Sequence, residues 1–178
     1  LEEERAKLQT RQVSTQERLG GNIAVKKIAA LKKPGIYGTI AELGKVTKKY
    51  SLALEMAAGS RLQSIVVQDD KIAADCIKYL RQNKFGAATF IPLNKIKAPQ
   101  VNESVKGLKK QQGVHDFCVD IVTFDSTFKK AFEYVFGDTL VVDDIDVARK
   151  IGIGNARMVT LHGDLADHSG VMRGGYHH

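Results

Sequence analysis

The chain has 178 residues and a mass of 19.5 kDa, and 43% of its residues are hydrophobic and 26% charged. This composition is typical of a folded globular protein with one ordinary domain or two small ones, and it excludes a largely disordered chain. No apolar run approaches the ~20 residues of a transmembrane helix, which excludes a membrane span. Because the chain begins at Leu1 without a charged-then-apolar leader, we expect an excerpt of a longer protein that carries no secretory signal.

Two cysteines are too few and too far apart for a disulfide framework or a Cys-rich zinc site, and they point to the cytoplasm. We expect Cys76 on a helix of the first half and Cys118 on a strand of the second, both packed as small apolar side chains.

The formal net charge of +7 is distributed unevenly along the chain. Residues 1–33 carry a net +4 and residues 34–113 a net +7, whereas residues 114–178 carry a net −4. Either this is ordinary scatter on a solvated surface, or the first two-thirds present a basic face to a polyanion. Aromatic residues are sparse in the lysine-rich stretches, so platforms for stacking bases are not indicated.

Residues 1–33 predict a helix that differs from the rest of the chain. Ala24, Ile28 and Leu31 follow the spacing of one helix face, and this apolar stripe is narrow enough to suit a coiled-coil seam rather than a buried core helix. Gly20-Gly21 should interrupt the helix, and Pro34-Gly35 should end it. We therefore expect a coiled-coil segment that leads into a globular domain.

The remainder contains an internal repeat, which makes its two halves comparable. Four residues, Tyr50, Ala53, Glu55 and Gly59, recur 78 residues later as Phe128, Ala131, Glu133 and Gly137. Beyond Gly59 the offset falls to 75, so that Val66-Val67 matches Val141-Val142. Each copy predicts a first strand, a helix closed by glycine, a buried strand, a second helix and a closing strand.

The repeat divides the chain into two α/β lobes related by a pseudo-twofold axis. The predicted boundaries are 1–33 for the coiled-coil segment, 34–113 for the first lobe with its linker, and 114–178 for the second lobe. Acidic pairs, Asp69-Asp70 and Asp143-Asp144, follow the buried strand of each copy. A catalytic carboxylate pair would have the same appearance in isolation, but the same position in both copies favours helix capping.

Other motifs give little support to catalysis or metal binding. No phosphate-binding GxxxxGK[ST] loop occurs, so we expect no catalytic residue, no cofactor and no ATP hydrolysis in this chain. His162, Asp164 and His168 lack the spacing of a zinc site, and hydrogen bonding in a glycine-rich turn explains them better. The final segment Ser169–Gly175 is either a flexible tail or a surface that lets another backbone approach closely.

Several spaced motifs, taken in order, resemble the hinge domain of the SMC family (structural maintenance of chromosomes). After the coil come Gly35–Gly38, Gly59–Gln63, Ala88–Leu93, Tyr134–Val142 and the final glycine-rich segment with Met172. The resemblance covers residues 34–176. It departs from the usual pattern at Ser60 and Ser169, where a second glycine is common, and at Arg173, where threonine is usual.

The resemblance implies a two-lobed α/β hinge with mixed sheets covered by helices, preceded by a coiled-coil helix, that pairs as a homodimer. It places the dimer interface at six residues: Gly59, Gly170, Val171, Met172, Gly174 and Gly175. It also implies that ATP is hydrolysed in head domains absent from this chain, and that the longer protein acts in chromosome condensation and segregation, in the cytoplasm at the nucleoid.

Two functions from different classes remain. The first is an SMC hinge with an auxiliary, weak and non-specific DNA-binding surface, without membrane or small-molecule partners. The expected DNA contacts are ten lysines: Lys26, Lys27, Lys32, Lys33, Lys45, Lys48, Lys49, Lys106, Lys109 and Lys110. The alternative is a two-lobed α/β domain that binds a small ligand or regulates another protein.

Overall fold

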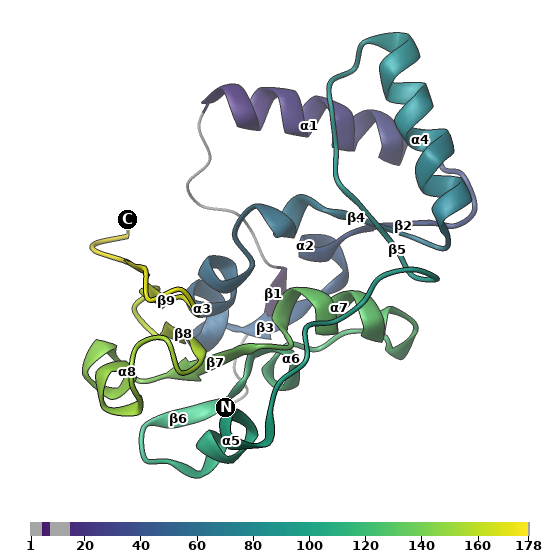
Figure 1. Cartoon of the computed structure of the whole chain (residues 1–178). Coiled ribbons are helices and arrows are strands. Elements are labelled where there is room, and N and C mark those ends of the chain that lie inside the picture. The colour runs from purple at the N-terminus through teal and green to yellow at the C-terminus, as the bar shows by residue number, and fades with distance from the viewer. Residues whose placement is uncertain (1–4, 8–14, 178) are drawn as a thin grey trace.

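A computed structural model describes residues 5–7 and 15–177, with side chains from residue 23 onward. The molecule is elongated and carries one lobe at each end (Figure 1). Helix α1 (Thr15–Ala30) and helix α4 (Asp70–Asn83) lie at one end, whereas α5 (Glu103–Gly107) and α8 (Ile145–Ile151) lie at the other. None of the described helices is long and apolar enough to cross a membrane.

Lobe I is built on a three-stranded sheet in the order β2-β4-β5. Strand β2 runs antiparallel to β4 and β5 parallel to it. The elements in chain order are β2 (Ile36–Thr39), α2 (Ile40–Leu43), β3 (Lys45–Thr47), α3 (Lys48–Ala58), the 3₁₀ helix η1 (Gly59–Gln63), β4 (Ile65–Val67), α4 and β5 (Phe90–Pro92).

Lobe II repeats this arrangement and extends it by two strands. Its five-stranded sheet has the order β10-β9-β8-β7-β6. After α5 and the 3₁₀ helix η2 (Leu108–Lys110), the elements are β6 (Val114–Phe117), α6 (Cys118–Ile121), the 3₁₀ helix η3 (Ser126–Phe128), α7 (Lys129–Phe136), β7 (Thr139–Val142), α8, β8 (Arg157–Thr160), β9 (Leu165–Ala166) and β10 (Met172–Arg173).

The predicted repeat is confirmed, and the two lobes share even an irregularity in strand pairing. The register between β2 and β4 shifts between Ile36 and Gly38, and that between β6 and β7 shifts between Val114 and Asp116, the equivalent positions at the offset of 78. Lys45 forms an antiparallel bridge with Thr123, its own equivalent, through two reciprocal N–H···O bonds of 2.8 Å. A residue can pair with its own repeat only beside the axis, so the pseudo-twofold passes through this bridge.

The acidic pairs cap helices, as predicted, through one member of each pair. Asp69 accepts the N–H of Ile72 at 2.8 Å at the start of α4, and Asp144 accepts that of Val147 at 2.9 Å at the start of α8. Both satisfy a backbone donor that the helix itself leaves unpaired. The other two carboxylates bind side chains: Asp70 accepts from Asn94, and Asp143 pairs with His115.

The two lobes share one central core. It joins α2 and α3 of lobe I to α6 and α7 of lobe II, with Leu54, Ala57, Phe132 and Phe136 fully buried. Each lobe has a second, smaller hydrophobic cluster between its sheet and its outer helix, α4 in lobe I and α8 in lobe II. Cys118 belongs to the central core as the first residue of α6, so its predicted position on a strand is wrong, although its predicted burial is confirmed.

Helix α1 precedes lobe I, as expected, but it packs differently from a free coil. Ala24 and Ile28 are buried against β4 and α4, which corrects the expectation that the stripe was too narrow for a core; Leu31 is exposed. The backbone remains helical through Gly20-Gly21, and the helix ends at Ala30, before Pro34. Arg5–Lys7 forms strand β1 against β3 rather than a helix, and the prediction for residues 1–4 and 8–14 lies outside the described residues.

Candidate functional site

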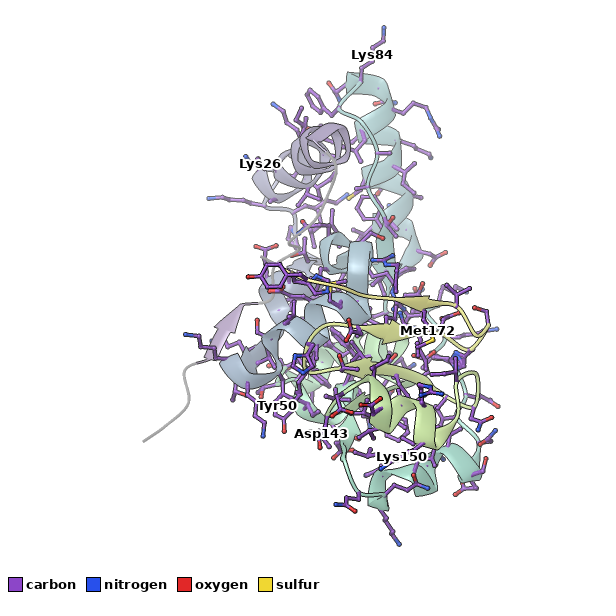
Figure 2. All side chains as sticks on the ribbon, turned by 90° about the vertical axis from the view of Figure 1, so that its left-hand side faces the viewer. Lys26, Tyr50, Lys84, Asp143, Lys150 and Met172 are labelled. Carbon is purple, nitrogen blue, oxygen red and sulfur yellow. The ribbon has the colours of Figure 1, made fainter. Side chains whose placement is uncertain are left out.

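The glycine-rich segment forms the outer edge of the lobe II sheet, so it is not a free tail. Strand β10 pairs with β9 through Met172↔Ala166 and Arg173↔Leu165, and its other edge bonds no described strand. Val171 is 63% and Met172 45% exposed at this edge, where Figure 2 shows Met172 at the surface. An open strand edge carrying exposed apolar side chains is suited to pairing with another chain.

Three of the predicted interface glycines have conformations that favour glycine, with free space in front of them. Gly59, Gly170 and Gly175 have φ angles of +58°, +93° and +141°, and a Cβ added at any of them would meet nothing within 4 Å. A side chain there would be strained by the backbone and would project away from the molecule. These three positions therefore fit a surface that a second backbone can approach.

Gly174 differs from these three glycines, because a contact within its own chain accounts for the lack of a side chain there. A Cβ at Gly174 would overlap the carboxylate of Asp164, which also accepts the N–H of Gly175 at 3.2 Å. Asp164 is held in turn by Thr160, whose hydroxyl receives the Asp164 N–H at 3.0 Å. The expected hydrogen-bonding role of Asp164 in a glycine-rich turn is confirmed, and no cluster of three metal-ligating side chains occurs among the described residues.

Two parts of the predicted interface lie within reach of one side chain. Arg157, at the start of β8, donates to the carbonyl of Ala57 at 3.1 Å and lies 3.5 Å from the carboxylate of Asp167. Ala57 precedes Gly59 by two residues, and Asp167 precedes Gly170 by three. The structure therefore brings Gly59 and the Gly170 loop to the same side of the molecule.

The ten predicted DNA contacts are all exposed, but they form three groups instead of one patch. The α1 group (Lys26, Lys27, Lys32, Lys33) lies at the end of that helix, the α3 group (Lys45, Lys48, Lys49) on β3 and the start of α3, and the linker group (Lys106, Lys109, Lys110) on α5 and η2. Figure 1 places α1 and α5 at opposite ends of the molecule, with β3 and α3 between them.

Some of these lysines already have partners within the chain. Lys33 forms an ion pair with Asp75 on α4 at 3.3 Å, so the end of α1 lies close to lobe I. Lys109 lies 3.4 Å from Asp116, and the Lys27 ammonium lies 4.6 Å from the centre of the Phe85 ring. Surface pairs of this kind contribute little stability and reduce the positive charge offered to a polyanion.

The linker group borders an open cavity of about 680 Å³. Its walls combine Lys106, Lys109 and Lys110 with apolar Val101, Phe117 and Val119. Asp120 also lines the cavity, and burial followed by repulsion from Asp116 raises the pKa of its carboxyl group. These carboxylates offset part of the lysine charge, which weakens the cavity as a site for a small anion.

Sequence reasoning missed two arginines beside the predicted interface. Arg61 donates to the carbonyls of Ala57 and Ala58 at 3.0 and 3.2 Å, so it shares the Ala57 carbonyl with Arg157. Burial, followed by the neighbouring Arg157 charge, lowers the pKa of Arg61. Arg61 lies within a motif that the resemblance covers, but no spacing in the sequence indicates that these two residues meet.

Comparisons with known proteins agree with this geometry. The family model described as the SMC proteins flexible hinge domain matches residues 33–152. The chromosome partition protein Smc of Aquifex aeolicus is 42% identical over 142 residues, covering 79% of this chain and 12% of the relative. That of Pyrococcus furiosus is 41% identical over 162 residues, covering 90% and 13%. The chain thus spans about an eighth of the length of these relatives.

Solved structures give the same assignment. The Pyrococcus furiosus Smc hinge domain with an extended coiled coil superposes with a TM-score of 0.79 at 39% identity, covering 92% of this chain and 57% of that one. An asymmetric dimer of the Geobacillus stearothermophilus SMC hinge domain gives a TM-score of 0.82 at 30% identity, covering 92% and 71%. Both superpositions cover most of the chain at 30% identity or more, and this chain belongs to the SMC hinge family.

Proposed function

We propose that this chain is the dimerisation module of a longer chromosome-organising SMC protein, and that it pairs with a second copy through the outer edge of β10. The observation that carries the proposal is the open β10 edge with exposed Val171 and Met172; Gly59, Gly170 and Gly175, where an added Cβ would meet nothing, support it. The related Geobacillus hinge domain crystallised as a dimer, which supports self-association.

The internal repeat suggests where the partner's β10 docks. In lobe II, strand β9 covers the outer edge of β8, whereas no described strand covers the outer edge of β5, which holds the equivalent place in lobe I. Pro92 lies in β5, as is usual for an edge strand. Lobe II of one copy would then add its edge to lobe I of the other, and a twofold dimer would make this contact twice.

The test is a charge placed on the exposed edge. Met172→Glu should yield a folded monomer of 19.5 kDa, because the new carboxylate is solvated in the monomer but buried beside apolar groups in the dimer. The matched control is Ile77→Glu, which is similarly exposed at 42% but lies on helix α4 and on neither of the two strand edges, β10 and β5. Light scattering gives the mass and circular dichroism the fold. A dimer that persists in Met172→Glu would refute this interface.

Met172 is a better site for this test than the neighbouring glycine. A glutamate at Gly174 would collide with Asp164 of its own chain, so a loss of dimer there would not distinguish contact from misfolding.

We further infer that the exposed lysines support weak, sequence-independent DNA binding. Lysines act as point charges toward phosphates and lack the planar fork with which arginine reads guanine. Their distribution in three groups favours contact with an extended backbone over a compact site. Nucleotide hydrolysis, chromosome condensation and chromosome segregation would then belong to the longer protein, which acts in the cytoplasm at the nucleoid.

A further inference from the structure

Arg157 connects three elements through one half-buried side chain. Its side chain is 14% exposed, and its guanidinium donates to the hydroxyl of Thr139 on β7 at 2.6 Å and to the carbonyl of Ala57 on α3 at 3.1 Å. The third contact is the carboxylate of Asp167, 3.5 Å from Nε. A planar guanidinium fixes the relative directions of its acceptors, which a flexible ammonium cannot do.

Asp167 in turn shapes the loop that carries Gly170. Its carboxylate accepts from the N–H of Ser169 at 3.2 Å and from the Ser169 hydroxyl at 2.8 Å. The Gly170 N–H donates to the Asp167 carbonyl at 3.0 Å, and the Asp167 N–H donates to the carbonyl of Val171 at 2.8 Å. These bonds close a tight turn immediately before β10. Ser169, which departs from the glycine usual in the family, therefore supplies a hydrogen bond that glycine could not.

Arg157 also holds the end of α3, so it acts as a clamp between that helix and the Asp167 loop. The last carbonyls of a helix have no partner within it, and at Ala57 two arginines satisfy one such carbonyl. Burial, followed by the neighbouring charge of Arg157, lowers the pKa of Arg61, so holding the two arginines together at a partly buried place is electrostatically unfavourable. An apolar side chain would fill a half-buried position at no such cost, so packing alone does not account for Arg157.

We propose that Arg157 is the positioning residue of the dimer contact: by clamping the end of α3 to the Asp167 loop, it holds Gly59 and Gly170 in the arrangement that a second copy recognises. This inference rests on the proposed dimer function. Pre-organising both parts of a contact spares the ordering cost at the moment of binding, so the clamp strengthens dimerisation without touching the partner.

The experiment replaces Arg157 while retaining its apolar stem. Arg157→Met should weaken the dimer about tenfold or more, the loss expected when charge-assisted hydrogen bonds are removed. Arg157→Lys should restore only part of the affinity, because one ammonium cannot hold all three acceptors. Sedimentation equilibrium over a dilution series gives the dissociation constants. The matched control is Arg149→Met, an exposed arginine on α8, which should dimerise like the wild type.

A second comparison separates positioning from a loss of stability. Val46→Ala removes a buried side chain from β3 in the central core, so it weakens the fold without altering β10 or the β5 edge. If Arg157 only stabilises the fold, Val46→Ala will weaken the dimer equally, and the proposal is wrong. Hydrogen exchange adds a direct readout: in the Met172→Glu background, Arg157→Met should speed exchange at the Gly59 and Gly170 amides and leave the amides of α4 unchanged.

The outcomes distinguish this proposal from the one on which it rests. A monomeric Met172→Glu together with a wild-type affinity in Arg157→Met overturns the clamp and keeps the interface. A dimeric Met172→Glu overturns the interface itself. If Arg157→Met does not fold, Asp167→Asn tests the clamp from its exposed end, since that carboxylate is 42% exposed and no part of a core. A wild-type affinity in Asp167→Asn would also overturn the clamp.

Discussion

At the scale of single residues, the two lobes require glycine at the same place for the same two reasons. Gly35 and Gly113 precede the first strand of each lobe with φ angles of +91° and +87°. A Cβ at Gly35 would overlap Ile72 on α4, and one at Gly113 would overlap Val147 on α8, its equivalent at the offset of 75. Backbone conformation and packing thus both exclude a side chain.

We expect Gly113→Ala to lower the free energy of unfolding by about 1–3 kcal/mol, because alanine adds steric strain at a positive φ and displaces Val147. Gly107→Ala is the matched control: Gly107 is helical, with φ −66°, and has nothing within 4 Å of its added Cβ. Alanine should leave stability unchanged or raise it by up to about 1 kcal/mol there. Urea denaturation measures both, and equal effects would contradict this account.

At the scale of elements, each lobe touches the other through a pair of rings related by the pseudo-twofold axis. Tyr37 on β2 meets Phe128 at a centroid distance of 5.2 Å, and its equivalent His115 on β6 meets Tyr50 at 5.4 Å. Only the second pair is polar. The Tyr50 hydroxyl lies 2.9 Å from His115 Nδ1, and His115 Nε2 lies 2.6 Å from Asp143. His115 thus links Tyr50 to Asp143, both of which are labelled in Figure 2.

The apolar pair indicates that ring contact suffices for this junction, so the polar pair adds only its hydrogen bonds. His115→Phe should therefore lower the free energy of unfolding by about 1 kcal/mol, as expected for the net loss of such bonds at a half-buried position. The control is Tyr37→Phe, whose hydroxyl lies on a 37% exposed side chain and should cost less than about 0.5 kcal/mol. Thermal unfolding of both variants measures these losses. A larger loss of stability in Tyr37→Phe than in His115→Phe would refute the role given to the hydrogen bonds of His115.

At the scale of the whole molecule, the three lysine groups make DNA binding a distributed property. The variant changes four lysines to glutamate: Lys48 of the α3 group, Lys110 of the linker group, and Lys26 and Lys32 of the α1 group. It should weaken DNA binding without disturbing the dimer. None of these four forms an ion pair with a described residue. The wild-type dimer should lose affinity with salt at a log–log slope near −0.9 per phosphate contacted on duplex DNA.

The control carries the same charge change outside the three groups: Lys78, Lys129, Lys130 and Lys150 to glutamate. If both variants lose affinity equally, net charge and not the three groups drives binding. Fluorescence anisotropy at low salt measures the affinities, and the absence of binding by the wild type would show that the lysines only solvate the surface. Saturable binding of a small organic anion, abolished by Lys106→Ala, would instead support a ligand site in the linker cavity.

The sequence alone determined the architecture, because the repeat is a local record of the fold. Strands such as Ile65–Val67, capping residues such as Asp69 and Asp144, and helix-ending glycines act through neighbouring atoms and recur at a fixed offset, so one chain reveals them twice. The spaced motifs likewise sufficed to indicate the family. The position of the glycine-rich segment at a surface contact remains a prediction.

The tertiary structure decided what depends on segments distant in sequence. Ala24 and Ile28 look like a coiled-coil stripe, but α4 lies against them and buries them. Three contacts join residues far apart in the sequence: Lys45 with Thr123, 78 positions apart, Tyr50 with His115, 65 apart, and Ala57 with Arg157, 100 apart. Arg157 also meets Asp167, which follows it after strand β9. No local spacing encodes such meetings, because side chains approach only after the lobes have closed on their shared core.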